Sequence, residues 1–144
     1  MKVWTIGFTK TSAERFFGRI RAAGVQRVVD VRLNNISQLA GFAKKDDLRY
    51  FLKVICSADY VHLTELAPTQ PILDKYKKGS RKWSEYEREF LSLMSTRRIE
   101  TTVPKETIDG ACLLCSEDKP HYCHRRLVAE YLRREWKDLE VEHL

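Results

Sequence analysis

The chain has 144 residues, of which 43% are hydrophobic and 32% charged, and its formal net charge is +6. This length suits one domain, and we expect residues 1–144 to form it. The sequence has no run of eighteen apolar residues and its start, MKVWTIGF, does not resemble a signal peptide, so we expect a cytoplasmic protein without a membrane segment. In a reducing compartment, four cysteines are more often thiols, metal ligands or catalytic groups than disulfides.

The first third of the chain alternates between strand and helix patterns. Residues 3–6 and 25–31 are apolar runs typical of strands. Between them, Thr11 and Glu14 have the spacing of a capping box, and a helical apolar face follows at Ala13, Phe16, Phe17 and Ile20. A strand, a helix and a strand in this order form a βαβ unit, which predicts a parallel sheet.

The remaining chain continues this alternation. Residues 60–63, the apolar run before Cys115 and residues 141–144 predict three further strands, and helices are expected after Asp46, from Ser84 and after Arg126. We therefore predict an α/β, single-domain, three-layer fold with a mainly parallel sheet of about five strands and helices on both faces. Its functional site is expected at the carboxyl edge of the strands.

Two charged residues stand at the end of the second predicted strand, which we expect to be buried. Asp30 and Arg32 lie on one face of the chain, with Val31 on the other. They can brace the loop as an ion pair; alternatively, Arg32 holds an anion while Asp30 positions it or moves a proton. Gly7 ends the first strand, where the backbone must turn tightly or approach another group, and we expect it at the substrate site.

Residues 111–126, ACLLCSEDKPHYCHRR, concentrate three of the four cysteines and two of the four histidines. One interpretation is a closed zinc site with the ligands Cys112, Cys115, Cys123 and His124. Strand parity opposes it, because side chains three positions apart in a strand face opposite sides of the sheet. Cys112 and Cys115 could then not share one ion.

In a second interpretation, Cys115 is a functional thiol placed where the strand gives way to the loop. The following helix start, Arg125 and a protonated His124 would each lower its pKa and make it a nucleophile. Glu117 could act as general acid or base, and Cys123 could resolve an oxidised or persulfidated Cys115. An open zinc or iron site built from Cys115, Cys123, His124 and Glu117 keeps the same geometry. A third interpretation gives these groups only a structural role, capping the helix start.

A basic segment with aromatic residues follows the third predicted strand. It contains Lys75, Tyr76, Lys77, Lys78, Arg81, Lys82 and Trp83. Aromatic rings among lysines can stack on bases and neutralise phosphates, although the same composition is found in surface flaps. The alternative to an enzyme is therefore a module that binds nucleic acid through this segment and the arginines of the last helix, with a structural Cys/His loop.

Several motifs together resemble one known family. They are TIGF at the start, DVR at residues 30–32, LLCSEDKPHYCHRRLVAEYL from residue 113, and VEHL at the end. This pattern resembles the family catalogued as domain of unknown function 488, over nearly the whole chain. The resemblance implies a compact α/β fold and brings no activity with it. The positions that match the family's motifs are Thr5, Gly7, Asp30, Arg32, Cys115, Glu117, Cys123, His124 and Arg125.

The chain departs from the family pattern where many relatives carry His or Tyr instead of Phe8, and a glycine pair instead of Ala67 and Pro68. We predict an enzyme that uses a reactive cysteine, or a Cys/His metal site, on an anionic substrate, with nucleotides and nucleic acids among the candidates. Sulfur transfer in the manner of rhodanese-like proteins is one concrete form. We assign catalysis to Cys115, Glu117, Asp30 and His124, and substrate binding to Gly7, Arg32, Cys123 and Arg125. The sequence leaves the reaction and the oligomeric state open.

Overall fold

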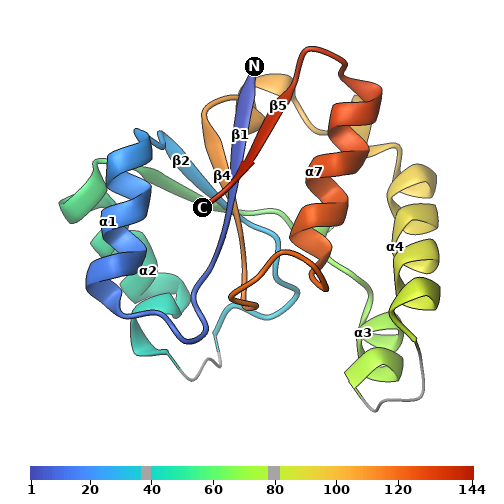
Figure 1. Ribbon diagram of the computed structural model, residues 1–144, viewed down its shortest axis with the longest axis horizontal. Helices are drawn as coiled ribbons and strands as arrows, with labels where there is room; N and C mark the ends of the chain where they lie inside the picture. The colour runs from blue at the N-terminus through green and yellow to red at the C-terminus, as the bar shows by residue number, and fades with distance from the viewer. Residues whose placement is uncertain (37–39, 78–81) are drawn as a thin grey trace.

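The computed structural model describes residues 1–36, 40–77 and 82–144, and a parallel sheet forms its centre (Figure 1). Within these residues five strands lie in the order β3-β2-β4-β1-β5, and all neighbouring strands are parallel. Their bounds are β1 Lys2–Gly7, β2 Arg27–Asp30, β3 Asp59–His62, β4 Ala111–Cys115 and β5 Glu140–His143. The predicted α/β fold with a mainly parallel sheet is confirmed.

The register of the sheet aligns the carboxyl ends of its central strands. Gly7 at the end of β1 pairs with Cys115 at the end of β4, and Asp30 at the end of β2 pairs with Leu114. The residues that follow these three strands therefore leave the sheet at one edge. Ligands of open parallel sheets bind beyond this edge, so the register brings the predicted motifs to the expected place.

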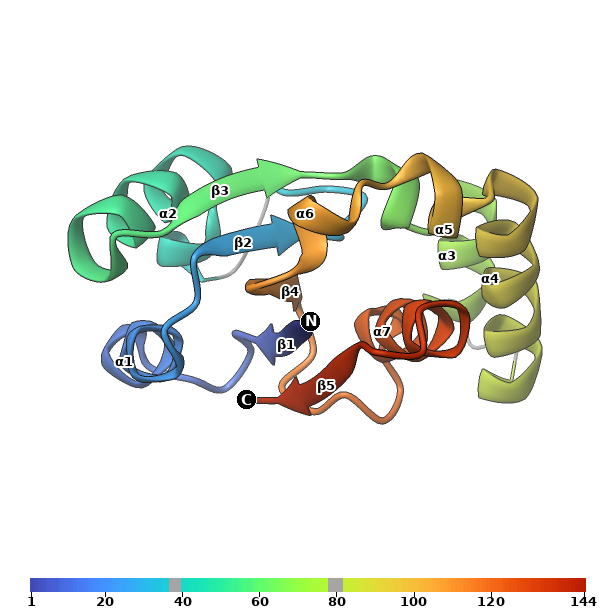
Figure 2. The same cartoon turned by 90° about the horizontal axis from the view of Figure 1, so that it is seen from above.

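One face of the sheet is covered by the helices that follow β1 and β2 (Figures 1 and 2). They are α1 Ala13–Ala23, the 3-10 turn η1 Gly41–Ala43, α2 Lys45–Phe51 and the π-helical segment η2 Leu52–Cys56. Three of the four apolar positions of α1 predicted from the sequence enter this core, with Phe16, Phe17 and Ile20 buried, whereas Ala13 is exposed. The helix is capped by Ser12, whose side chain accepts the N–H of Arg15, and not by the predicted Thr11.

The other face of the sheet carries the helices from the second half of the chain (Figures 1 and 2). They are α3 Gln70–Lys77, preceded by the 3-10 turn η3 Thr64–Leu66, α4 Trp83–Arg97, α5 Ile99–Thr102, α6 Lys105–Ile108 and α7 His124–Glu135. Phe90 and Met94 of α4 pack with Leu127 and Val128 of α7 in the core on this side. The sheet is thus the middle of three layers, as the sequence predicted.

Some element boundaries differ from the predicted ones. Strand β2 has four residues, Arg27–Asp30, and is shorter than the predicted 25–31. Helix α4 begins at Trp83, one residue before the predicted Ser84, and no side chain caps it. None of the helices formed by residues 1–36, 40–77 and 82–144 is long and apolar enough to cross a membrane.

The two cysteines of β4 face opposite sides of the sheet. Cys112 lies in the core beneath α1 and α2, whereas Cys115 belongs to the core beside α4 and α7. The parity argument from the sequence is therefore correct, and the closed zinc site with four ligands is excluded. Only the second cysteine reaches the edge of the sheet where β4 ends.

Candidate active site

The loop between β4 and α7 is held in place by a buried arginine. Arg125 is 0% exposed, and its Nη1 donates to the carbonyl of Glu117 at 2.5 Å. Its other nitrogens lie 3.4 Å from the carbonyl of Asp118 and from Oγ1 of Thr5, and Thr5 Oγ1 also pairs with Nδ1 of His143 at 2.6 Å. The guanidinium predicted to bind substrate is therefore engaged with the loop and with β1, away from solvent.

Gly7 lies directly under the same loop. A Cβ atom at this position would overlap the carbonyl group of Glu117, so only glycine leaves room for the loop. Next to it, the backbone N–H groups of Phe8 and Thr9 donate to the carbonyl of Ser116 at 3.3 and 3.0 Å. The close approach predicted from the sequence exists, and the group that approaches is the chain's own backbone.

Three side chains with sulfur or nitrogen ligand atoms gather where the loop meets α7. The ligand atoms of Cys115, Cys123 and His124 lie within 4.8 Å of one another, and all three residues are buried. The Nε2 of His124 donates to the carbonyl of Val31 at 2.7 Å, because a carbonyl can only accept. This bond leaves Nδ1 as the nitrogen that can take a proton or bind a metal.

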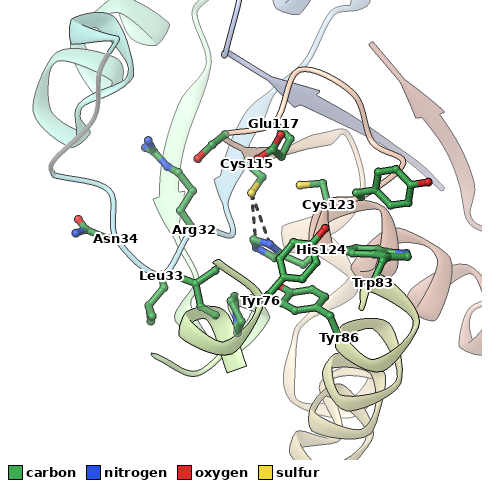
Figure 3. A pocket seen from close by; sticks show the side chains of 14 residues that line it. Arg32, Leu33, Asn34, Tyr76, Trp83, Tyr86, Cys115, Glu117, Cys123 and His124 are labelled. Carbon is green, nitrogen blue, oxygen red and sulfur yellow. Dashed lines mark hydrogen bonds between the residues drawn. The ribbon is translucent and has the colours of Figure 1, made fainter. Parts of the chain in front are cut away.

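The sulfur of Cys115 lies beside the imidazole of His124. It is 3.6 Å from Nδ1 and 3.9 Å from Nε2 (Figure 3). Because these distances are similar, the sulfur does not lie on the line of either lone pair, and proton transfer to Nδ1 requires the ring to turn. In the present arrangement, a positive charge on His124 would act on the sulfur through space.

The three buried cysteines have pKa values displaced in opposite directions. A hydrogen bond from Cys123 and the positive charge of Arg125 lower the pKa of Cys115, against the effect of burial. Burial raises the pKa of Cys123, and its hydrogen bond to Cys115 raises it further. Burial also raises the pKa of Cys112 on the other face. Cys115 is therefore the buried thiol that ionises first.

Asp30 and Arg32 form a buried ion pair at the end of β2. The carboxylate of Asp30 accepts hydrogen bonds from Nε and Nη2 of Arg32 at 2.8 and 2.7 Å and from the hydroxyl of Tyr60 at 2.6 Å. Nη2 of Arg32 also donates to the carbonyl of Ala43, while its Nη1 is buried and has no partner among the described residues. This geometry fits the bracing interpretation, because the oxygens of Asp30 are occupied by the protein itself.

A pocket of about 520 Å³ opens over Cys115 at this edge of the sheet (Figure 3). Its lining includes five residues predicted from the sequence, namely Arg32, Cys115, Glu117, Cys123 and His124. The other three predicted site residues, Gly7, Asp30 and Arg125, do not line it and support the groups that do. The volume lies in the range of small-molecule sites.

Four aromatic residues form one side of this pocket, and the sequence analysis named two of them, Tyr76 and Trp83, as rings that could stack on a ligand. The four are Tyr76 of α3, Trp83 and Tyr86 of α4, and Tyr122 of the loop before α7, and we call them the aromatic wall. Tyr86 and Tyr122 were not among the predicted site residues, although Tyr122 adjoins Cys123. Of the basic segment predicted to meet phosphates, residues 78–81 lie outside the described residues.

The cluster of Cys115, Cys123 and His124 has the donor set of a site for a thiophilic metal. Thiolate and imidazole ligands suit zinc and iron, and a carbonyl bonded to the second nitrogen is common for a metal-bound histidine. Glu117, the further ligand considered from the sequence, is not part of this cluster. The described residues thus offer three protein ligands, with room for a fourth from the pocket side.

These observations define an α/β protein with a cysteine- and histidine-containing pocket at the carboxyl edge of its sheet. The model of the family described as "Domain of unknown function DUF488" matches residues 12–132, and the chain belongs to that family. Comparisons with curated proteins and with solved structures give no match.

Proposed function

We propose that the protein is a thiol-dependent enzyme whose nucleophile is Cys115. The observation that carries this proposal is the difference between two thiols of one strand. Cys115 lines the pocket and its pKa is lowered, chiefly by the hydrogen bond from Cys123, whereas Cys112 is enclosed and its pKa is raised by burial. The thiolate is the reactive form of cysteine, so Cys115 is the residue suited to attack an electrophile.

The neighbouring groups take supporting roles in this proposal. His124 receives the proton of Cys115 through Nδ1 after its ring turns, since Nε2 is held by Val31. Glu117 has an exposed side chain on the lining of the pocket, where it can exchange a proton with a substrate or with water. Asp30 acts as a positioning residue, because its carboxylate fixes Arg32 at the rim of the pocket.

The proposal also limits the charge of the substrate. The sequence predicted an anion held by Arg32 and Arg125, with nucleotides or nucleic acid as candidates. Arg125 donates to loop carbonyls, and Arg32 is neutralised by Asp30 except for its Nη1. Among the described residues, an anionic group of the substrate therefore depends on Arg32 alone, and we propose that the pocket takes small molecules with at most one such group.

The metal cluster gives a second candidate function at the same residues. If Cys115, Cys123 and His124 hold zinc or iron, the metal supplies Lewis-acid or redox chemistry beside the pocket. The observation that favours this candidate is the Val31 carbonyl on Nε2 of His124, which leaves Nδ1, 3.6 Å from the sulfur of Cys115, as the nitrogen that can bind the metal.

Iodoacetamide labelling at pH 7, read cysteine by cysteine by mass spectrometry, tests the proposal. The protein is purified without oxygen, and its zinc and iron contents are measured first. For a nucleophile, metal-free native protein should label at Cys115 faster than the same cysteine does in urea-unfolded protein, despite its burial. Labelling that is slower in the native state contradicts the proposal.

The remaining outcomes separate the alternatives. One equivalent of tightly bound metal, with Cys115 labelled only after chelation, favours the metal candidate. Salt-dependent binding of DNA or RNA that Cys115→Ser leaves unchanged, together with slow labelling, favours the nucleic-acid-binding module with a structural loop. In the enzyme, Cys115→Ser should abolish turnover while the circular dichroism spectrum stays the same.

A further inference from the structure

The aromatic wall is a continuous surface beside the proposed nucleophile. The ring of Trp83 lies 5.1 Å from that of Tyr86 in a stacked arrangement, and 5.7 and 5.5 Å from the rings of Tyr76 and Tyr122 in edge arrangements. All four residues line the same pocket as Cys115. Figure 3 shows Tyr76, Trp83 and Tyr86 on one side of it. Three of the four residues come from the consecutive helices α3 and α4, whereas Tyr122 precedes α7 much later in the sequence, so the fold completes this surface at the pocket.

Core packing explains only part of the wall. Tyr86 is buried and stacks on Phe90 of the core, 6.1 Å away, but Tyr122 is 65% exposed and contacts Trp83 edge-on. Trp83 is itself half-buried, with Tyr86 stacked on it and the guanidinium of Arg126 over its ring at 6.0 Å from the centroid. A large aromatic surface left in contact with water inside a concave pocket is typical of a ligand-binding surface.

The other described residues that line the pocket supply little free charge. Leu33, Pro68 and Leu73 add apolar surface to the lining. Of the charged side chains among the described lining residues, Arg32 is paired with Asp30, which leaves Glu117 as the exposed charge. A ligand would therefore be held chiefly by contact with rings and apolar side chains. Aromatic surfaces bind planar groups with offset-stacked or edge-to-face geometry.

We infer that the substrate of Cys115 carries a planar aromatic or heteroaromatic ring that packs against the aromatic wall. This inference rests on the proposed function, since it places the ring beside the sulfur that attacks the substrate. The ring lies against Trp83 and Tyr122 while an electrophilic atom attached to it reaches Sγ of Cys115. In the attack, the new bond to sulfur forms as the leaving group departs with the electron pair of the broken bond.

Two alkylating reagents of the same chemistry test the inference. Iodoacetamide and its N-phenyl derivative both transfer a methylene carbon to sulfur and release iodide, but only the second carries a ring. Each rate at Cys115 is divided by the rate with glutathione, which corrects for intrinsic reactivity. We expect the N-phenyl reagent to be favoured about tenfold or more and its rate to saturate with concentration, because stacking on an aromatic side chain is worth about 1–3 kcal/mol.

Two exposed tyrosines provide a matched pair of variants. Tyr122→Ala should remove most of the preference for the N-phenyl reagent, whereas Tyr50→Ala on α2, where the tyrosine is 63% exposed and outside the pocket, should keep it. Trp83→Leu should remove the preference as well, and circular dichroism shows whether α4 stays folded. Iodoacetamide itself should label Tyr50→Ala at the rate of the unmodified protein, and the preference of each variant is the ratio of its own two corrected rates, so that a change in the reactivity of Cys115 cancels.

Different results would contradict the inference and the proposed function. Equal corrected rates for the two reagents, both linear in concentration, overturn the inference while fast labelling by iodoacetamide still supports a nucleophilic Cys115. A preference that survives Tyr122→Ala and Trp83→Leu also overturns it. If iodoacetamide labels native Cys115 more slowly than the unfolded chain, the proposed function fails, and the inference fails with it.

Discussion

The two faces of the sheet place the same functional group in opposite situations. Cys112 and Cys115 belong to one strand, but the first lies under α1 and α2 in a closed core, and the second lies where the opposite core opens into a pocket. Burial raises the pKa of Cys112, whereas a hydrogen bond from Cys123 and the charge of Arg125 lower that of Cys115. The neighbours of a thiol, and not its burial alone, decide whether it ionises.

The difference arises from where the strand ends. Cys115 is the last residue of β4, so the loop that follows can bring Cys123 and His124 back to it, while Arg125 ties the loop to β1. Cys112 is three residues earlier and has strands on both sides, since it pairs with Trp4 and Val28. The face under α1 and α2 has an apolar core that stabilises the sheet. The face toward α4 and α7 can hold polar groups at its edge, because these groups are paired with one another.

The largest expected effect is the difference in reactivity between the two thiols. Cys112 is 0% exposed, so its alkylation requires an open state of the core. In a stable domain, about one molecule in 10³ or fewer is in such a state. We therefore expect iodoacetamide at pH 7 to label native Cys115 about 10³-fold faster than Cys112. Peptide mass spectrometry after timed labelling measures both in one sample. Similar rates would remove the contrast between the faces.

Breaking the ion pair at the rim should have the next largest effect. Asp30→Asn leaves Arg32 as an uncompensated buried charge, and we expect a loss of about 3–5 kcal/mol in the free energy of unfolding. Asp59→Asn removes an exposed pair with Lys53 and should cost less than about 1 kcal/mol. Urea denaturation of the two variants checks this. A small loss in Asp30→Asn would mean that Arg32 finds solvent or another acceptor.

Gly7 and Gly18 test the contact between β1 and the loop. A methyl group at Gly7 overlaps the backbone of Glu117, whereas one at Gly18 in α1 meets nothing within 4 Å. Gly7→Ala should destabilise the protein by about 1–3 kcal/mol and slow the labelling of Cys115, because the loop must move. Gly18→Ala should stabilise it by up to about 1 kcal/mol, since alanine favours helix. Thermal and urea unfolding of both variants measure this, and a neutral Gly7→Ala would contradict the loop contact.

The sequence was sufficient for those parts of the site that depend on strand geometry. Alternation along a strand places Cys112 and Cys115 on opposite faces, and the ends of parallel strands meet at one edge, so the shared location of Arg32 and Cys115 was predictable. Neither inference needs knowledge of distant contacts.

The parts that were not predictable depend on contacts between distant segments. The sequence pointed to Arg125 as a substrate ligand, but its burial results from a loop that folds back onto Gly7. Tyr86 is buried and also lines the pocket, and helical periodicity does not show where a core ends and a pocket begins. Tyr122 becomes part of the wall only because α4 brings Trp83 beside it.

The smallest and most specific expected effect is a change in the pKa of Cys115 when its hydrogen-bond donor, Cys123, is removed. Cys123→Ala removes the hydrogen bond that is the largest cause of the lowered pKa of Cys115. Its pKa should then rise, so the curve of alkylation rate against pH moves to higher pH and the rate at pH 7 falls with the thiolate fraction. Cys56→Ala, a partly buried thiol near α1, should leave the curve in place. If Cys123→Ala does not move the curve, the charge of Arg125 and the backbone N–H of Ser116 set the pKa of Cys115. Cys123 would then act only as the resolving thiol, after the first bond to the sulfur of Cys115 has formed.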